Sequence, residues 1–170
     1  DQGKQSVWFA ISPQAIRLRE TANIETDFQT FNTLIQHTRL HEHHDLATCP
    51  ACLNQLRQAV DLANGDFLDG FSLADSLQFE EWTLLTREQI FQDHLNALKQ
   101  LGLVAEKMGN HTELQQIAQR QIALEPWHEA AYSQLMRSLA LTGQRSAALV
   151  QFERCRTVLH RCRWDHRTSG

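Results

Sequence analysis

Glycine and proline are scarce in this chain, with seven Gly and three Pro among 170 residues. So few turn-forming residues favour long helices over a fold of many short strands. No apolar run approaches the roughly 18 residues that a membrane-spanning helix needs, and no basic leader precedes an apolar stretch. We therefore expect neither a membrane span nor a signal peptide, and we expect a cytoplasmic protein.

The chain also lacks a strong net charge and a disulfide framework. A net charge of −4 excludes a global attraction to nucleic acid or to an anionic membrane, so such contacts would need a local basic patch. The four cysteines, at positions 49, 52, 155 and 162, do not have the pattern of a small secreted protein. The 42% share of hydrophobic residues is sufficient for a substantial core in one domain, or in one domain with a fragment of a second.

The first residues have a β-type pattern that the rest of the chain lacks. VWFAI (7–11) is a β-forming run, AIRLR (15–19) alternates apolar with polar residues, and Ser12-Pro13-Gln14 between them is turn material. This pattern predicts a short β-hairpin, which is too small to be stable alone in water. We expect it to pack on the helices that follow or on a part of the protein outside this chain.

From Asp27 onward, apolar residues recur with the spacing of amphipathic helices. Asn64-Gly65 and Gly109-Asn110 are helix-ending signals, and Ser76 is placed to cap a long helix. The loop GDFLDGFSLADS (65–76) carries enough apolar residues to pack against the protein. The expected helices cover about residues 27–40, 53–63, 77–108, 112–124, 127–141 and 144–160.

Two glycine turns indicate an internal repeat, because Gly109 and Gly143 are separated by the period of tetratricopeptide units. The sequence therefore predicts an all-α, tetratricopeptide-like array of helical hairpins, although unrelated antiparallel helices with glycine turns would produce part of this pattern. Apolar and small residues coincide at the same offset: Leu98 with Tyr132, Leu101 with Leu135, Ala105 with Leu139, Leu114 with Ala148, and Ala118 with Phe152.

Several stretches resemble one known family. They are G-D-F-L-x-G-F from position 65, F-E-E-W at 79–82, L-x-P-W-x-E-x-A from position 124, and A-L-V-Q-F-E-R-C-R at 148–156. Over about residues 25–160 the chain resembles the bacterial transcriptional activator domain of transcription regulators of the Streptomyces antibiotic regulatory protein type. In that family the module follows a winged helix whose last element is a β-hairpin, and FAISPQAIRL resembles the end of such a hairpin.

The resemblance implies three parts and a function. Residues 1–24 would be the β-hairpin remnant of a winged-helix DNA-binding domain, 25–162 the helical activator and interaction domain, and 163–170 a tail. The implied partners are proteins, reached by self-association or by contact with the transcription machinery. DNA would be bound through the winged-helix part, most of which is absent from this chain.

The stretch HEHHDLATCPACL (41–53) has the composition of a metal site. The two-residue gap between Cys49 and Cys52 lets both thiolates bind one tetrahedral ion. His41 and His43, with His44 as a substitute, are near enough for a loop to fold back and complete a structural zinc site. Two other interpretations stay open: a polar loop in which Thr48 caps the next helix, and a redox pair, although the βαβ context of such pairs is missing.

A stand-alone metal-binding helical repeat protein, with a scaffold or hydrolytic role, is the alternative function. A catalytic zinc leaves one position open, whereas the five donors of this loop favour a closed structural site. No Gly-rich phosphate loop, nucleophile elbow or H-E-x-x-H motif occurs, so we expect no enzyme. Trp82 and Trp127 could line a ligand groove, but at helical spacing they are expected in the core, as is Leu85. His94 and His111 are expected at the surface or at caps. The arginines after position 153 would either form a solvated helix face or contact phosphate.

Overall fold

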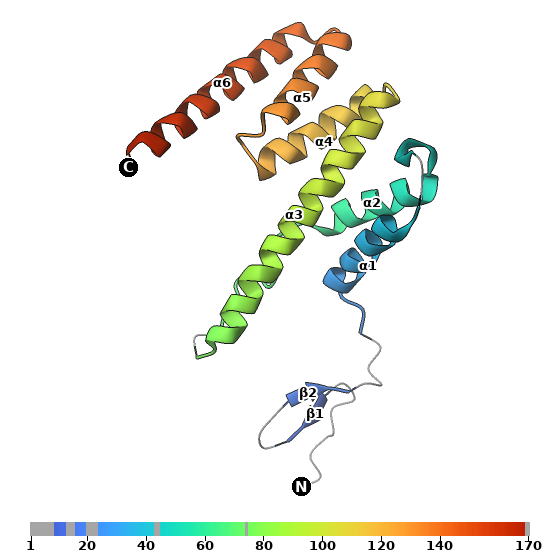
Figure 1. Cartoon of the computed structure of the whole chain (residues 1–170), viewed down its shortest axis with the longest axis vertical. Coiled ribbons are helices and arrows are strands. Elements are labelled where there is room, and N and C mark those ends of the chain that lie inside the picture. The colour runs from blue at the N-terminus through green and yellow to red at the C-terminus, as the bar shows by residue number, and fades with distance from the viewer. Residues whose placement is uncertain (1–8, 13–15, 20–23, 43–44, 74, 169–170) are drawn as a thin grey trace.

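The computed structural model of the chain describes residues 9–12, 16–19, 24–42, 45–73 and 75–168 (Figure 1). Its body is helical, as the sequence predicts. The elements, in chain order, are strands β1 (Phe9–Ile11) and β2 (Ile16–Leu18), helix α1 (Asp27–Leu40), the short 3-10 helix η1 (Leu46–Thr48), and helices α2 (Pro50–Leu62), α3 (Leu77–Lys107), α4 (His111–Leu124), α5 (Glu129–Leu141) and α6 (Arg145–Thr168).

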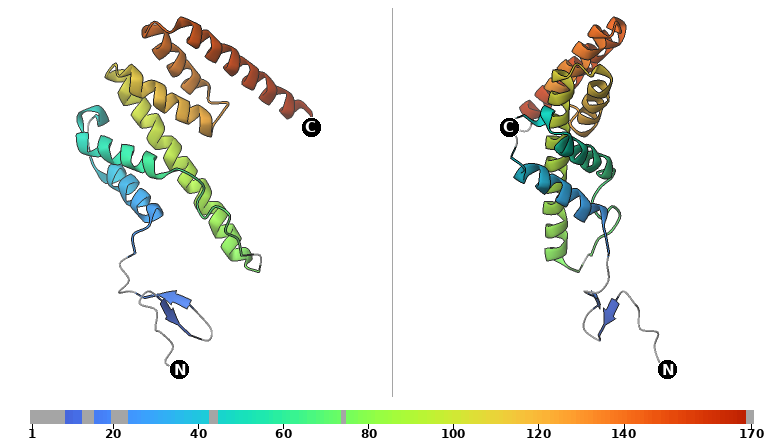
Figure 2. Two further views of the ribbon diagram at one scale, coloured as in Figure 1. Left: turned by 180° about the vertical axis from the view of Figure 1, so that it is seen from behind. Right: turned by 90° about the vertical axis from the view of Figure 1, so that its right-hand side faces the viewer.

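The two strands pair antiparallel, with Phe9 opposite Leu18 and Ile11 opposite Ile16. The expected turn residues Pro13 and Gln14 lie outside the described residues. In every view the strand pair lies apart from the helices (Figures 1 and 2). The strands therefore contribute nothing to the helical core, and their origin in a winged-helix domain stays a prediction.

Each helix packs against the next one along the chain, from α1 on α2 through to α5 on α6 (Figure 2). This order of neighbours is typical of a helical repeat array, in which contacts are local in sequence. The core consists of two clusters that meet at α4. The first includes Phe31, Ile35, Leu53, Leu56, Leu98, Leu101 and Leu114, and the second includes Ile122, Tyr132, Leu135, Leu139 and Cys155.

Local signals define the helix ends. The Thr26 hydroxyl accepts the Gln29 N–H at 3.1 Å, and the Ser76 hydroxyl accepts the Phe79 N–H, so α1 and α3 begin where the sequence predicts. Gly109 and Gly143 end α3 and α5 with φ of +66° and +81°, in the left-handed region that glycine adopts without strain. The repeat turns therefore share one backbone conformation.

Two predicted boundaries are wrong. Thr48 does not cap α2: its hydroxyl donates to the Asp45 carbonyl at 2.8 Å within η1, and Cys49 is the residue that precedes the helix. The last helix continues to Thr168, beyond the predicted end near position 160, so residues 163–168 of the expected tail are helical.

The first half of α3 is covered on one side only, by the loop at 65–73. The Phe67 ring lies 4.7 Å from the Phe28 ring and 5.5 Å from Trp82, while the Arg87 guanidinium donates to the Phe67 carbonyl at 2.7 Å. Trp82 nevertheless stays 48% exposed and Leu85 63% exposed. Their predicted core positions are wrong because, among the described residues, no helix packs across this end of α3.

Two further side chains are placed differently from the prediction. Trp127 is exposed in the turn before α5, where it follows Pro126 and precedes the helix. His94, expected at the surface, is buried in α3. Both errors concern tertiary neighbours, which the helical period does not specify.

Candidate metal site and interaction surfaces

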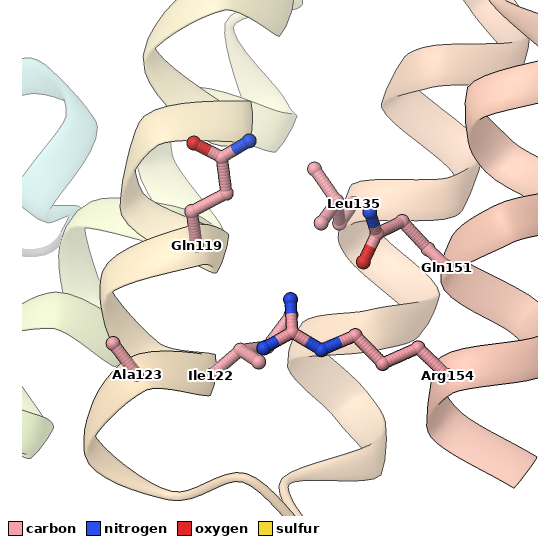
Figure 3. A pocket seen from close by; sticks show the side chains of 6 residues that line it. All are labelled: Gln119, Ile122, Ala123, Leu135, Gln151 and Arg154. Carbon is pink, nitrogen blue, oxygen red and sulfur yellow. The ribbon is translucent and has the colours of Figure 1, made fainter. Parts of the chain in front are cut away.

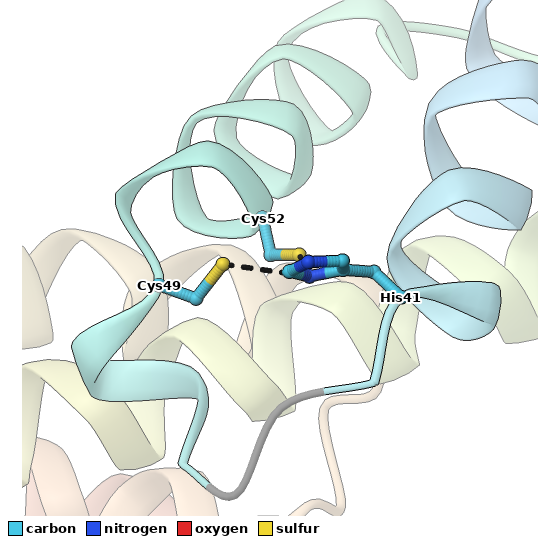
Figure 4. Close-up of side chains that lie close together, drawn as sticks. All are labelled: His41, Cys49 and Cys52. Atoms are coloured by element: carbon cyan, nitrogen blue, oxygen red, sulfur yellow. Dashed lines mark hydrogen bonds between the residues drawn. The ribbon is translucent and has the colours of Figure 1, made fainter.

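The corner between α1 and α2 places a histidine and two cysteines together. His41 is the residue that ends α1, Cys49 immediately precedes α2, and Cys52 lies one turn inside that helix (Figure 4). Pro50 fits the first helical position because a proline has no N–H to leave unpaired there. The corner therefore brings three donors from two helix ends to one point.

The three donor atoms lie within 4.8 Å of one another. His41 Nδ1 is 3.0 Å from Cys52 Sγ and 3.6 Å from Cys49 Sγ, so the imidazole faces both sulfurs (Figure 4). Cys52 is only 1% exposed, whereas Cys49 is half-buried. The site is thus open on one side and closed by α2 on the other.

The two thiols have opposite electrostatic environments. Hydrogen bonds from the backbone and then the side chain of Cys52 hold the pKa of Cys49 below its ordinary value. Burial raises the pKa of Cys52, and its hydrogen bond and charge interaction with Cys49 raise it further. Cys49 is therefore the thiol that ionises first in the metal-free protein.

Of the four ligands predicted from the sequence, the structure places His41, Cys49 and Cys52. His43 and its substitute His44 lie outside the described residues. Zinc binding by these residues stays a prediction, because proximity of donors does not by itself demonstrate a metal.

An apolar groove of about 620 Å³ lies between the start of α1, the loop at 65–73 and α3. Its apolar lining includes Phe28, Phe31, Leu68, Trp82 and Ile90, and Asp27 and Asp66 lie at it as well. The sequence predicts that the loop packs against the protein and that Trp82 is a core residue, with a position lining a ligand groove as the alternative. The structure places Trp82 in the lining of this groove.

Next to this groove, α3 exposes an apolar stripe that we call the leucine stripe, formed by Leu77, Leu84 and Leu85. These side chains are 81%, 67% and 63% exposed. Positions seven and eight residues after Leu77 lie on the same side of a helix, so the three form one surface. The helical spacing predicts one inward side of this helix, on which it places Leu85, and does not predict the stripe.

A smaller hollow of about 300 Å³ lies where α4, α5 and α6 meet (Figure 3). Ile122 and Leu135 form its apolar floor, and Gln119, Gln151 and Arg154 surround it. The Arg154 side chain reaches from α6 toward α4 across the hollow (Figure 3). This arrangement combines an apolar surface with one cation.

Consecutive helices that each pack against the next define a helical repeat protein. Proteins of this class present extended surfaces, such as the groove and the apolar stripe, rather than enclosed active sites. Residues 26–162 match the family described as bacterial transcriptional activator domain, and the chain belongs to that family. This confirms the resemblance and identifies the chain as part of a transcription regulator. The family is a regulatory one rather than an enzyme family.

No curated protein and no solved structure gives a significant match to the chain. In the part of the chain that the structure describes, none of the helices has the length and apolar character required to cross a bilayer.

Proposed function

We propose that this chain is the interaction and oligomerisation module of a bacterial transcription regulator, and that a winged-helix part preceding it binds DNA. Membership of the activator domain family supports the regulator role. The leucine stripe is the observation that carries the interaction role, because a soluble helix seldom exposes three leucines on one side without a partner.

The stripe has the geometry of a helix-docking surface. Leu77, Leu84 and Leu85 lie along about two turns of α3, and the exposed Glu81 falls on the same side between them. Full burial of a leucine side chain contributes about 1.5–3 kcal/mol, so the six leucines of two facing stripes contribute about 9–18 kcal/mol, against about 4–15 kcal/mol for the entropy of association. A second copy of the module, which offers the same apolar stripe, is the first partner we expect.

The strand pair supports the position of the DNA-binding part. β1 and β2 form a ladder that lies apart from the helical body (Figure 1). A two-stranded sheet of this size requires further packing for stability. A winged-helix domain that continues the pair on its N-terminal side would supply that packing.

The test is a double substitution, Leu84→Glu with Leu85→Glu, in the full-length regulator. We expect it to lower the apparent mass in concentration-dependent light scattering and to reduce transcription from a reporter promoter. The matched control is Asn96→Asp with Gln100→Glu, which adds two charges at exposed polar positions of the same helix, more than ten residues after Leu85. If the leucine double variant associates and activates like the control, the stripe is not an interaction surface and the proposal is wrong.

A further inference from the structure

We propose that His41, Cys49 and Cys52 hold a Zn²⁺ ion that joins the end of α1 to the start of α2, with the fourth tetrahedral position left to a ligand other than these three. The proposal is independent of the leucine stripe. The three donors lie at the turn between α1 and α2, whereas the stripe lies on the first part of α3. It rests on the arrangement of three donor atoms that come from two different elements and converge on one point.

The distances fit a tetrahedral ion with little movement. With Zn–S of about 2.3 Å and Zn–N of about 2.0 Å, tetrahedral angles place a nitrogen about 3.5 Å from each sulfur and the two sulfurs about 3.8 Å apart. The observed separation from His41 Nδ1 is 3.6 Å to Cys49 Sγ and 3.0 Å to Cys52 Sγ. An ion at the centre therefore requires the imidazole to move from Cys52 by a few tenths of an ångström, which a single side-chain rotation supplies.

The donor set selects the metal. Thiolate sulfur and imidazole nitrogen are ligands for zinc and other soft or borderline ions, whereas calcium and magnesium require oxygen. Two thiolates and a neutral imidazole also balance the charge of a divalent cation. An unpaired negative charge on the buried sulfur of Cys52 would carry a desolvation penalty, and a bound cation would offset that penalty.

The local backbone prepares the cysteines for this role. Cys49 immediately precedes α2 and Cys52 lies in its first turn, where the helix dipole favours negative charge on a thiolate. Ligand spacing of two residues across a helix start is typical of structural zinc sites.

A disulfide between Cys49 and Cys52 is the competing state of the same two sulfurs. Both cysteines are free thiols in the structure. A disulfide would leave the imidazole of His41 facing an uncharged sulfur pair and would give it no role. The zinc site instead uses all three groups, and thiol counting distinguishes the two states directly.

The primary experiment measures metal content in protein purified without chelators. We expect elemental mass spectrometry to find about one zinc per chain. Removal of the zinc by a strong chelator should lower the melting temperature of the α1–α2 end. Added Co²⁺ should then give near-ultraviolet thiolate-to-cobalt bands and visible bands of tetrahedral intensity. This spectrum reports the ligands in the unaltered protein, so it does not depend on whether a variant folds.

The variants are Cys49→Ser with Cys52→Ser, and separately His41→Ala. We expect each to reduce bound zinc at least tenfold, while circular dichroism retains the helices after position 76 because repeat packing is local. Cys155→Ser is the matched control, since this buried cysteine lies in the α6 part of the core, away from the corner, and should leave the zinc content unchanged. Zinc absent from the unaltered protein, a Cys49–Cys52 disulfide, or undiminished zinc in the variants would each overturn the proposal.

Discussion

His94 makes the stability of this domain depend on pH in a direction that can be calculated. Its side chain is only 8% exposed within α3, and the buried Nε2 atom has no hydrogen-bond partner in the described part of the chain. Burial and, after it, the positive charge of Arg120 together lower the pKa of His94 to about 4. Arg120 itself is held by Asp61 at 3.0 Å and by the Val60 carbonyl at 2.6 Å.

The folded-state pKa lies below the value of about 6.5 for an unfolded histidine. The unfolded chain therefore binds the proton first, and this contribution to stability is complete above the unfolded pKa and is lost as the pH falls toward 4. Between pH 7 and pH 5 the loss amounts to at most about 2 kcal/mol, because one pKa unit corresponds to about 1.4 kcal/mol. For a protein of this size, that loss lowers the melting temperature by about 4–8 °C.

The measurement compares urea unfolding of the unaltered protein and His94→Leu at pH 7 and pH 5. The variant keeps an apolar side chain of similar volume in α3 but cannot bind the proton, so its pH dependence should be smaller by the amount calculated above. Contributions from carboxylates and from bound metal occur in both proteins and cancel in the difference. Equal pH dependence in His94→Leu and the unaltered protein would refute the reasoning.

Two other outcomes follow from burial and charge. Leu98→Ala replaces a fully buried side chain of α3 and should lower the free energy of unfolding by about 2–5 kcal/mol. Leu84→Ala, on the exposed side of the same helix, should change the free energy of unfolding by less than about 0.5 kcal/mol. Similar losses in both variants would contradict the assigned core. The isolated chain should bind duplex DNA weakly, without sequence preference and with strong salt dependence, because its net charge is −4. A salt-resistant, sequence-specific complex in a mobility-shift assay would contradict that expectation.

Signals that act within a few residues allowed most of the helical fold to be predicted. Thr26 and Ser76 cap the helices that follow them, and Gly109 and Gly143 form the turns of the repeat. The approach of His41 to Cys49 and Cys52 belongs to the same category, because a short loop joins them. Such features depend on backbone geometry that the local sequence specifies.

Burial in the first half of α3 could not be predicted in the same way. Trp82 and Leu85 have the spacing of core residues, but a period identifies the side of a helix and not whether another element covers it. His94 was misplaced for the converse reason, since a polar residue on a covered side looks like a surface residue in the sequence. The leucine stripe was missed because it results from where the neighbouring helices stop.

The length of α3 gives the molecule a mechanical property. At 1.5 Å per residue its 31 residues form a rod of about 46 Å, with one end in the repeat array and the other projecting past α1 and α2 (Figure 1). A tilt of about 5° at the anchored end displaces the projecting end by about 4 Å, close to the width of a side chain. Any contact that reorients α4 and α5 is therefore magnified at the far tip, so α3 can act as a lever between surfaces that never touch each other.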